Sequence, residues 1–187
     1  MERIKAIGTE EATGKAKELL VDIQRKLGMT PNMMRTMAHS PAVLEAYLNF
    51  SSTLGGGSLK AKLREQIALV VGEVNGCQYC LSAHSALGQM AGLGQEEILD
   101  SRRGESSESK TRSALRFARK LVTERGRVDD HELAQVRKAG FSDGEIAEII
   151  ANVALNLFTN YFNHVADTQV DFPAVSPLID QPERKSA

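Results

Sequence analysis

The fold of this chain follows from residues 58–91, which read SLKAKLREQIALVVGEVNGCQYCLSAHSALGQMA. The first half predicts a helix capped by Ser58, because apolar side chains recur there at helical spacing, at Leu63, Ile67, Val70, Val71 and Val74. Asn75-Gly76 is a helix-stop signal, and a second helix is expected from about Cys77 to about Ala91. Two helices joined by so short a link can pack against each other as a helical hairpin.

The rest of the chain also reads as helices, because clean period-2 alternation bounded by turns is absent from the sequence. We expect N-terminal helices within residues 9–54, a core with the cysteine pair at about 58–95, C-terminal helices within 110–168 and an extended tail at 169–187. The polar segment Ser101–Lys110 is expected to be a loop between the two helical halves. The fold class predicted is all-α, a single-domain helical bundle.

The longest predicted helix runs from about Asp143 to Asp167, behind a capping box formed by Ser142 and Glu145. Its apolar residues cover more than one face, which is typical of a buried helix. Such a helix is either the centre of the core or part of a subunit interface, and the sequence favours neither.

The composition and the apolar runs of the chain bear on whether it binds nucleic acid or a membrane. The chain has 187 residues and a net charge of -1, so a strongly basic nucleic-acid surface over the whole chain is excluded. The N-terminus lacks the apolar stretch of a secretory signal, and the longest apolar run, Ile67–Val71, is too short to span a membrane. These features predict a cytoplasmic protein that binds neither membrane nor nucleic acid.

The residues that carry chemistry are Glu65, Cys77, Cys80 and His84. The spacing places both cysteines and His84 on one face of the second helix. Cys77 stands where that helix begins, and the free N–H groups and the helix dipole there favour thiolate, the reactive form of cysteine. His84 can exchange a proton with Cys80, and Glu65 on the preceding helix can orient His84 if the helices pack as a hairpin.

Other interpretations of these residues remain open. The cysteines can be small buried hydrophobic residues, and Glu65 can be a solvated helix charge. The same four side chains can also be zinc ligands, but most would come from one short stretch of helix. We therefore predict a redox pair with no metal and no cofactor.

The chain resembles the alkylhydroperoxidase D-like (AhpD-like) family, in the peroxidase-related branch of the carboxymuconolactone decarboxylase superfamily. The resemblance is carried by Arg64–Cys80 with Ala83–Gly88, by Pro31–Met34 and Ala38–Pro41, and by Val153–Ala166 with Asp171–Pro173. It extends over about residues 30–175. The combination of Glu65 with a CxxCxxxH motif is more specific than CxxC alone.

The resemblance implies an all-helical fold, assembly as trimers or hexamers, and reduction of hydroperoxides by thiols without haem or metal. Cys80 is then the thiol that attacks the peroxide, Cys77 the resolving thiol, and His84 with Glu65 the proton relay. The best-known members have a second histidine where this chain has Tyr79. A phenol with a pKa near ~10 does not shuttle protons at neutral pH. Tyr79 and His164 are expected as possible pocket residues.

Our first hypothesis is therefore an antioxidant peroxidase that cycles through a CxxC disulfide. Its partners are a hydroperoxide substrate, a lipoyl-carrying or thioredoxin-like dithiol donor, and further copies of the chain. The alternative, which Tyr79 favours, is a thiol–disulfide oxidoreductase or redox sensor with weak peroxidase activity. A non-enzymatic oligomeric module and a zinc enzyme are the remaining hypotheses.

Overall fold

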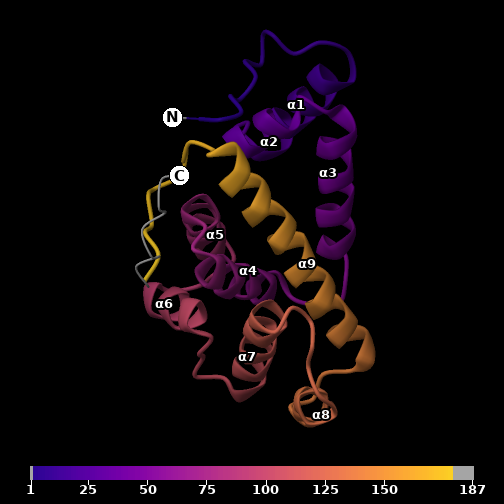
Figure 1. The fold of residues 1–187 in the computed structure, drawn as a ribbon, viewed down its shortest axis with the longest axis vertical. Coiled ribbons are helices and arrows are strands. Elements are labelled where there is room, and N and C mark those ends of the chain that lie inside the picture. The colour runs from indigo at the N-terminus through magenta and orange to yellow at the C-terminus, as the bar shows by residue number, and fades with distance from the viewer. Residues whose placement is uncertain (1, 179–187) are drawn as a thin grey trace, which may run out of the picture.

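The computed structural model describes residues 2–178, and these form an all-helical single domain (Figure 1). Its helices, in chain order, are α1 (Gly14–Leu27), α2 (Asn32–Met37), α3 (Pro41–Gly55), α4 (Ala61–Asn75), α5 (Gln78–Met90), α6 (Gln95–Arg103), α7 (Ser109–Thr123), α8 (Asp130–Lys138) and α9 (Asp143–Ala166). The described residues include no β-strand, as predicted from the sequence.

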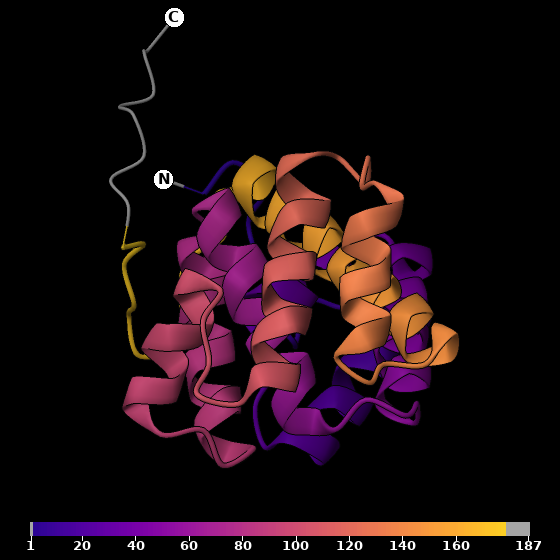
Figure 2. The same cartoon turned by 90° about the horizontal axis from the view of Figure 1, so that it is seen from below.

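Helix α4 is the centre of the molecule. Its residues 66–73 are all buried, and it packs against α5, α6, α7 and α9. Apolar side chains of α4, α7, α8 and α9 form one core cluster. Figure 2 shows α7 and α8 side by side over this part of the molecule. A second cluster joins α1, α2 and α3 to the start of α5, and it contains both cysteines. The cysteine pair therefore lies inside a packed core.

Helix α9 crosses the molecule beside α3 and α4 (Figure 1). Its capping box is formed as predicted, because Ser142 accepts a hydrogen bond from the backbone N–H of Glu145 and the Glu145 carboxylate accepts one in return. One face of α9 is buried. The opposite side of the helix exposes the apolar side chains of Ile150, Phe158 and Tyr161. The central helix is thus α4, which is buried over residues 66–73, and α9 combines a core face with an apolar outer face.

The structure corrects two local predictions. Ser58 does not cap α4, which begins at Ala61 behind Lys60. Instead the backbone N–H groups of Ser58 and Leu59 donate to the Glu148 carboxylate of α9, at 2.8 and 2.9 Å, so a long-range contact replaces the local cap.

The second correction concerns the polar segment Ser101–Lys110. Its first residues belong to α6, and its last two begin α7. Polarity misled the prediction because α6 buries only one side, with Ile98, Ser101 and Arg102 facing inward. The true loop is shorter than expected.

The chain after α9 is non-helical through residue 178 and runs back along α5 and α6, where Val175 and Ser176 make hydrogen bonds to Ser82 and Arg102. The predicted tail extends to residue 187, and residues 179–187 lie outside the described part. The N-terminal segment lies against the end of α9, where Arg3 and Ile4 donate backbone hydrogen bonds to the carbonyl of Ala166.

Candidate functional site

The link between α4 and α5 positions the cysteines. Helix α4 ends at Asn75, and Gly76 adopts a left-handed conformation with φ +63°, which glycine tolerates because it has no Cβ. The Cys77 N–H then donates to the Gly72 carbonyl at 2.9 Å, which turns the chain sharply into α5. Cys77 is the N-cap residue of α5, and its Sγ accepts a hydrogen bond from the Cys80 N–H at 3.3 Å.

Cys77 and Cys80 are joined as a disulfide. Their exposed fractions are only 2% and 3%, so solvent and partner proteins do not reach the sulfur atoms without movement of the surrounding chain. The Sγ atom of Cys80 accepts a hydrogen bond from Asn163 Nδ2 on α9 at 3.4 Å. The same amide nitrogen donates to the sulfur of Met33 on α2 at 3.3 Å.

Glu65 and His84 meet across the hairpin. Glu65 Oε2 lies 2.7 Å from His84 Nδ1, and both side chains keep about a fifth of their surface exposed, at 21% and 23%. A carboxylate on Nδ1 fixes the ring orientation and leaves Nε2 as the atom that can give or take a proton. The structure therefore brings together the two residues that the sequence placed on separate helices.

These two residues line a small cavity of about 80 Å³ between α3, α4, α5 and α9. Its other lining residues include Tyr47 of α3 and the polar side chains Asn152, Asn156 and Thr159 of α9. Burial, with the nearby Glu65 carboxylate, raises the pKa of Tyr47 to about 12. The phenol of Tyr47 therefore remains neutral at physiological pH.

Tyr79 and His164 do not appear among the described residues that line this cavity, in contrast to the sequence-based expectation. Tyr79 is 5% exposed, its hydroxyl accepts the Met33 N–H at 3.2 Å, and its ring meets Phe172 edge-on at 5.9 Å. Burial raises its pKa, and the carboxylate of Asp171 adds to the effect. Tyr79 thus joins α5 to α2 and to the tail. His164 lies in the last turn of α9 and is partly buried.

The tail after α9 passes over the start of α5. Asp171 accepts the backbone N–H of Asn32 at 2.7 Å, and the Val175 N–H donates to Ser82 Oγ at 3.0 Å. Val170 and Phe172 pack against the cluster that contains the cysteines. The tail is therefore part of the cover that keeps the disulfide out of solvent.

Two further observations bear on the class of site. Among residues 2–178, no three His, Cys, Asp or Glu side chains gather in an arrangement that could hold a metal ion. Within the same residues, no helix is long and apolar enough to cross a lipid bilayer.

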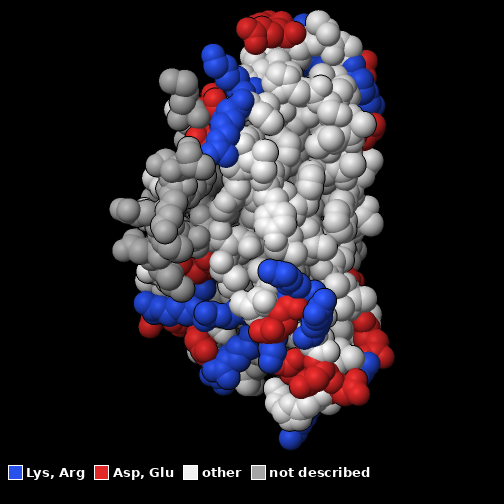
Figure 3. Space-filling model, viewed as in Figure 1, with Lys and Arg blue, Asp and Glu red and all other residues white. Residues whose placement is uncertain are grey.

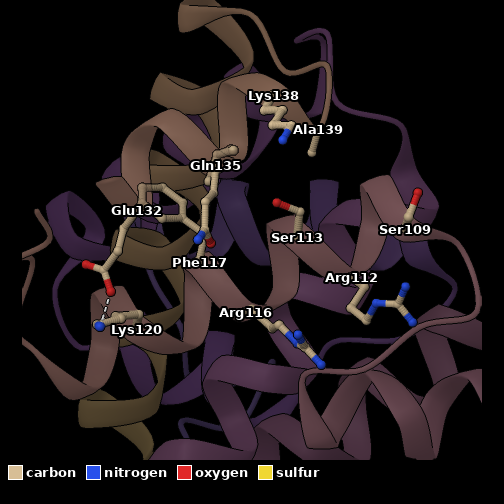
Figure 4. A pocket seen from close by; sticks show the side chains of 11 residues that line it. Ser109, Arg112, Ser113, Arg116, Phe117, Lys120, Glu132, Gln135, Lys138 and Ala139 are labelled. Carbon is tan, nitrogen blue, oxygen red and sulfur yellow. Dashed lines mark ion pairs between the residues drawn. The ribbon is translucent and has the colours of Figure 1, made fainter. Parts of the chain in front are cut away.

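A roomier hollow of about 410 Å³ lies between α7 and α8 (Figure 4). Arg112, Arg116, Lys120 and Lys138 line it, but two of these cations are already neutralised. Figure 4 shows Lys120 paired with Glu132, and Arg116 pairs with Glu105. Its described lining residues include neither cysteine nor histidine, whereas the smaller cavity is lined by Glu65 and His84, two of the residues singled out from the sequence.

Sequence reasoning missed Asn163, Tyr47 and the asparagines of the cavity. A signal was present, since the asparagines at 152, 156, 160 and 163 recur at helical spacing in an otherwise apolar helix. All four are buried. Polar residues on the buried face of a helix need partners, so such a run indicates either an internal hydrogen-bond network or a site.

Comparisons with known proteins agree with this architecture. Residues 41–124 match the model of the carboxymuconolactone decarboxylase family. An uncharacterized peroxidase-related protein from Silicibacter sp. TM1040 has 26% sequence identity and a TM-score of 0.79, over 90% of this chain and 92% of the other. An uncharacterized peroxidase-related protein from Ralstonia eutropha JMP134, described as an alkylhydroperoxidase AhpD core, has 22% identity and a TM-score of 0.80, over 91% and 94% of the two chains.

The debrominase Bmp8, solved with 2,3,4-tribromopyrrole, shares the fold at 20% identity and a TM-score of 0.78, over 91% of this chain and 92% of the other. A comparison with curated protein sequences returned no match. The fold thus occurs in proteins with different activities, and the reaction has to be argued from the residues of the site.

Proposed function

Because residues 41–124 match the model of the carboxymuconolactone decarboxylase family and the chain has the fold of AhpD-related proteins, we propose that it is an antioxidant peroxidase that reduces alkyl hydroperoxides with thiols. The observation that supports this most directly is the 2.7 Å contact between Glu65 and His84 on the same helical hairpin that holds the Cys77–Cys80 disulfide. A proton relay beside a cysteine pair is what a thiol peroxidase needs.

The proposed cycle begins with the reduced pair. The Cys80 thiolate attacks the outer oxygen of the hydroperoxide, the O–O bond breaks, and the alkoxide leaves with a proton to become an alcohol. Cys80 is then a sulfenic acid. Cys77 attacks its sulfur, water leaves, and the disulfide seen in the structure forms. A dithiol donor returns two electrons and two protons to the disulfide by exchange.

His84 supplies the proton for the leaving alkoxide from Nε2, while Glu65 holds Nδ1 and stabilises the protonated ring. His84 follows Cys80 by one helical turn, so both point to the same side of α5. The cycle uses no metal and no cofactor. Its electron donor is a lipoyl-carrying or thioredoxin-like dithiol protein, and its setting is the cytoplasm.

The outer face of α9 supports assembly into a homo-oligomer, a trimer or a hexamer. Phe158, Tyr161 and Val165 follow one another at helical spacing and are 39%, 60% and 63% exposed. Figure 3 shows a broad surface without charged side chains over the middle of this face, with the charges gathered at its two ends. Apolar patches of this kind on soluble proteins mark interaction surfaces.

A second candidate is a thiol–disulfide oxidoreductase or redox sensor with weak peroxidase activity. Tyr79 favours it, because this phenol occupies the place of a relay histidine and is held in a buried contact with Met33 and Phe172. A raised pKa keeps Tyr79 protonated, so it does not carry protons to or from the cysteines.

The test is stopped-flow oxidation of the fully reduced protein by an organic hydroperoxide, with free thiols counted before and after. We expect rapid loss of both thiols of the chain. Cys80→Ser should abolish the reaction with the fold intact, and Cys77→Ser should stop at a sulfenic acid that dimedone traps. Oxidation at the rate of an ordinary free thiol would refute the peroxidase, and capture of a protein as a mixed disulfide would then support the second candidate.

A further inference from the structure

The buried amide of Asn163 has an unusual set of neighbours. Its side chain lies on the last turns of α9, and only 4% of the residue is exposed. Its nitrogen donates to two sulfur atoms, Cys80 Sγ at 3.4 Å and Met33 Sδ at 3.3 Å. Because this N–H group donates only to sulfur, it is placed to stabilise a negative charge on either sulfur atom.

The other end of the same amide has no partner among the described residues. Asn163 Oδ1 is buried and accepts no hydrogen bond. An unsatisfied buried carbonyl group destabilises the folded state, and neutral disulfide and thioether sulfurs are weak acceptors that offset little of this. In the oxidised state, therefore, the hydrogen bonds of this amide give it no evident stabilising role.

Reduction changes this balance. When a dithiol donor transfers two electrons, the S–S bond breaks, Cys77 takes a proton as a thiol, and Cys80 remains as a thiolate with its proton released to solvent. A hydrogen bond to an anion is about twice as strong as one to a neutral acceptor. Since Met33 carries no charge in either state, the gain for Asn163 comes from Cys80 alone.

We propose that Asn163 is the hydrogen-bond donor that stabilises the Cys80 thiolate, and thereby sets both the reactivity of Cys80 and the ease with which the disulfide is reduced. This inference rests on the proposed function only in taking Cys80 as a redox-active thiol. It also bears on which cysteine attacks. Cys77 is stabilised by the start of α5 through the Cys80 N–H, whereas Cys80 has a side-chain donor of its own from α9.

The first measurement is the pH dependence of Cys80 alkylation by iodoacetamide in a Cys77→Ser background, which needs no peroxide. Asn163→Ala should raise the pKa of Cys80 by about one unit, the scale of a hydrogen bond to a charged group. Asn163→Leu, which leaves no room for a replacement water, should raise it at least as much and serves where the alanine variant is unstable.

Asn160→Ala is the matched control. Asn160 is fully buried one turn earlier on α9, and its Oδ1 accepts a hydrogen bond from Asn75 Nδ2. It should leave the pKa of Cys80 unchanged. If the Asn163 variants leave this pKa where it was, or if Asn160→Ala raises it equally, the proposal is wrong and Asn163 is a packing residue.

The second measurement is the equilibrium between the disulfide of the otherwise unmodified chain and dithiothreitol, taken at about pH 9 so that the thiolate form contributes in every variant. Losing the donor should shift this equilibrium about tenfold toward the disulfide, which is about 30 mV for a two-electron couple. An unchanged equilibrium would contradict the proposal. If the unmodified protein reacts slowly with peroxide but the Asn163 variants shift the Cys80 pKa and the disulfide equilibrium, the peroxidase is rejected and the role of Asn163 stands. If the protein reacts rapidly with peroxide but the Asn163 variants shift neither quantity, the peroxidase stands and the role of Asn163 is rejected.

Discussion

Arg102→Met should destabilise the protein far more than the loss of an ordinary surface ion pair. Arg102 of α6 and Glu73 of α4 are almost fully buried, with side chains 5% and 4% exposed, and Nε donates to Oε2 at 2.8 Å. The backbone of the tail also makes hydrogen bonds to both members of this pair. Arg102 also donates to the Ser176 carbonyl at 2.6 Å, and Glu73 Oε1 accepts the Leu178 N–H at 2.6 Å.

The magnitude follows from what the substitution leaves behind. Methionine fills most of the space of the arginine stem, but the Glu73 carboxylate loses its cation while it remains buried. Removing one partner of a buried pair costs about 3–5 kcal/mol. For a chain of this length, about 2–4 °C of melting temperature are lost per kcal/mol, so a fall of about 6–20 °C is expected.

Urea and thermal unfolding followed by circular dichroism measure this loss. Arg102→Met combined with Glu73→Leu should recover more than half of it, because the buried charge is then gone as well. Arg116→Met is the control, since Arg116 and Glu105 are 64% and 44% exposed and such pairs contribute about 0–1 kcal/mol. A loss below about 1 kcal/mol for Arg102→Met, or no recovery in the double variant, would refute this reasoning.

Three further predictions follow from the contacts described above. His84→Ala should slow peroxide oxidation of the reduced cysteine pair by about 100-fold, because it removes the proton donor, and Glu65→Gln should slow it less, because it only misorients that donor. If stopped-flow oxidation of both variants is as fast as that of the unmodified protein, these residues are not a proton relay. The hydrogen bonds from Ser58 and Leu59 lower the pKa of Glu148, so the stability that this carboxylate contributes is present above pH 4.5 and is lost as the pH falls through the lowered pKa. Glu148→Gln should therefore make the free energy of unfolding less dependent on pH in this acid range, and an unchanged pH dependence would contradict this. Tyr161→Lys should reduce the particle mass seen by analytical ultracentrifugation, and an unchanged mass would show that the outer face of α9 is not the interface.

Local sequence signals predicted the helical boundaries well wherever a cap or stop residue acts on its own neighbours. Gly76 ends α4 in the left-handed conformation, and Ser142 caps α9 by accepting from the Glu145 N–H. The prediction failed where a distant residue takes over. Glu148 supplies the partner that Ser58 was expected to provide, and α6 is stabilised by inward-facing side chains in a segment whose composition resembles a loop.

The candidate site shows the same division. That Cys77 stands at the start of a helix, with Cys80 and His84 on the turns that follow, is a consequence of spacing and helical geometry, and the sequence alone determines it. The pairing of Glu65 with His84 required the hairpin to close. The contact of Asn163 with Cys80 joins residues 83 positions apart, and only the packing of α9 against α5 creates it. Local hydrogen bonds and periodicity are encoded within a few residues, whereas contacts between helices depend on how all the buried faces fit together.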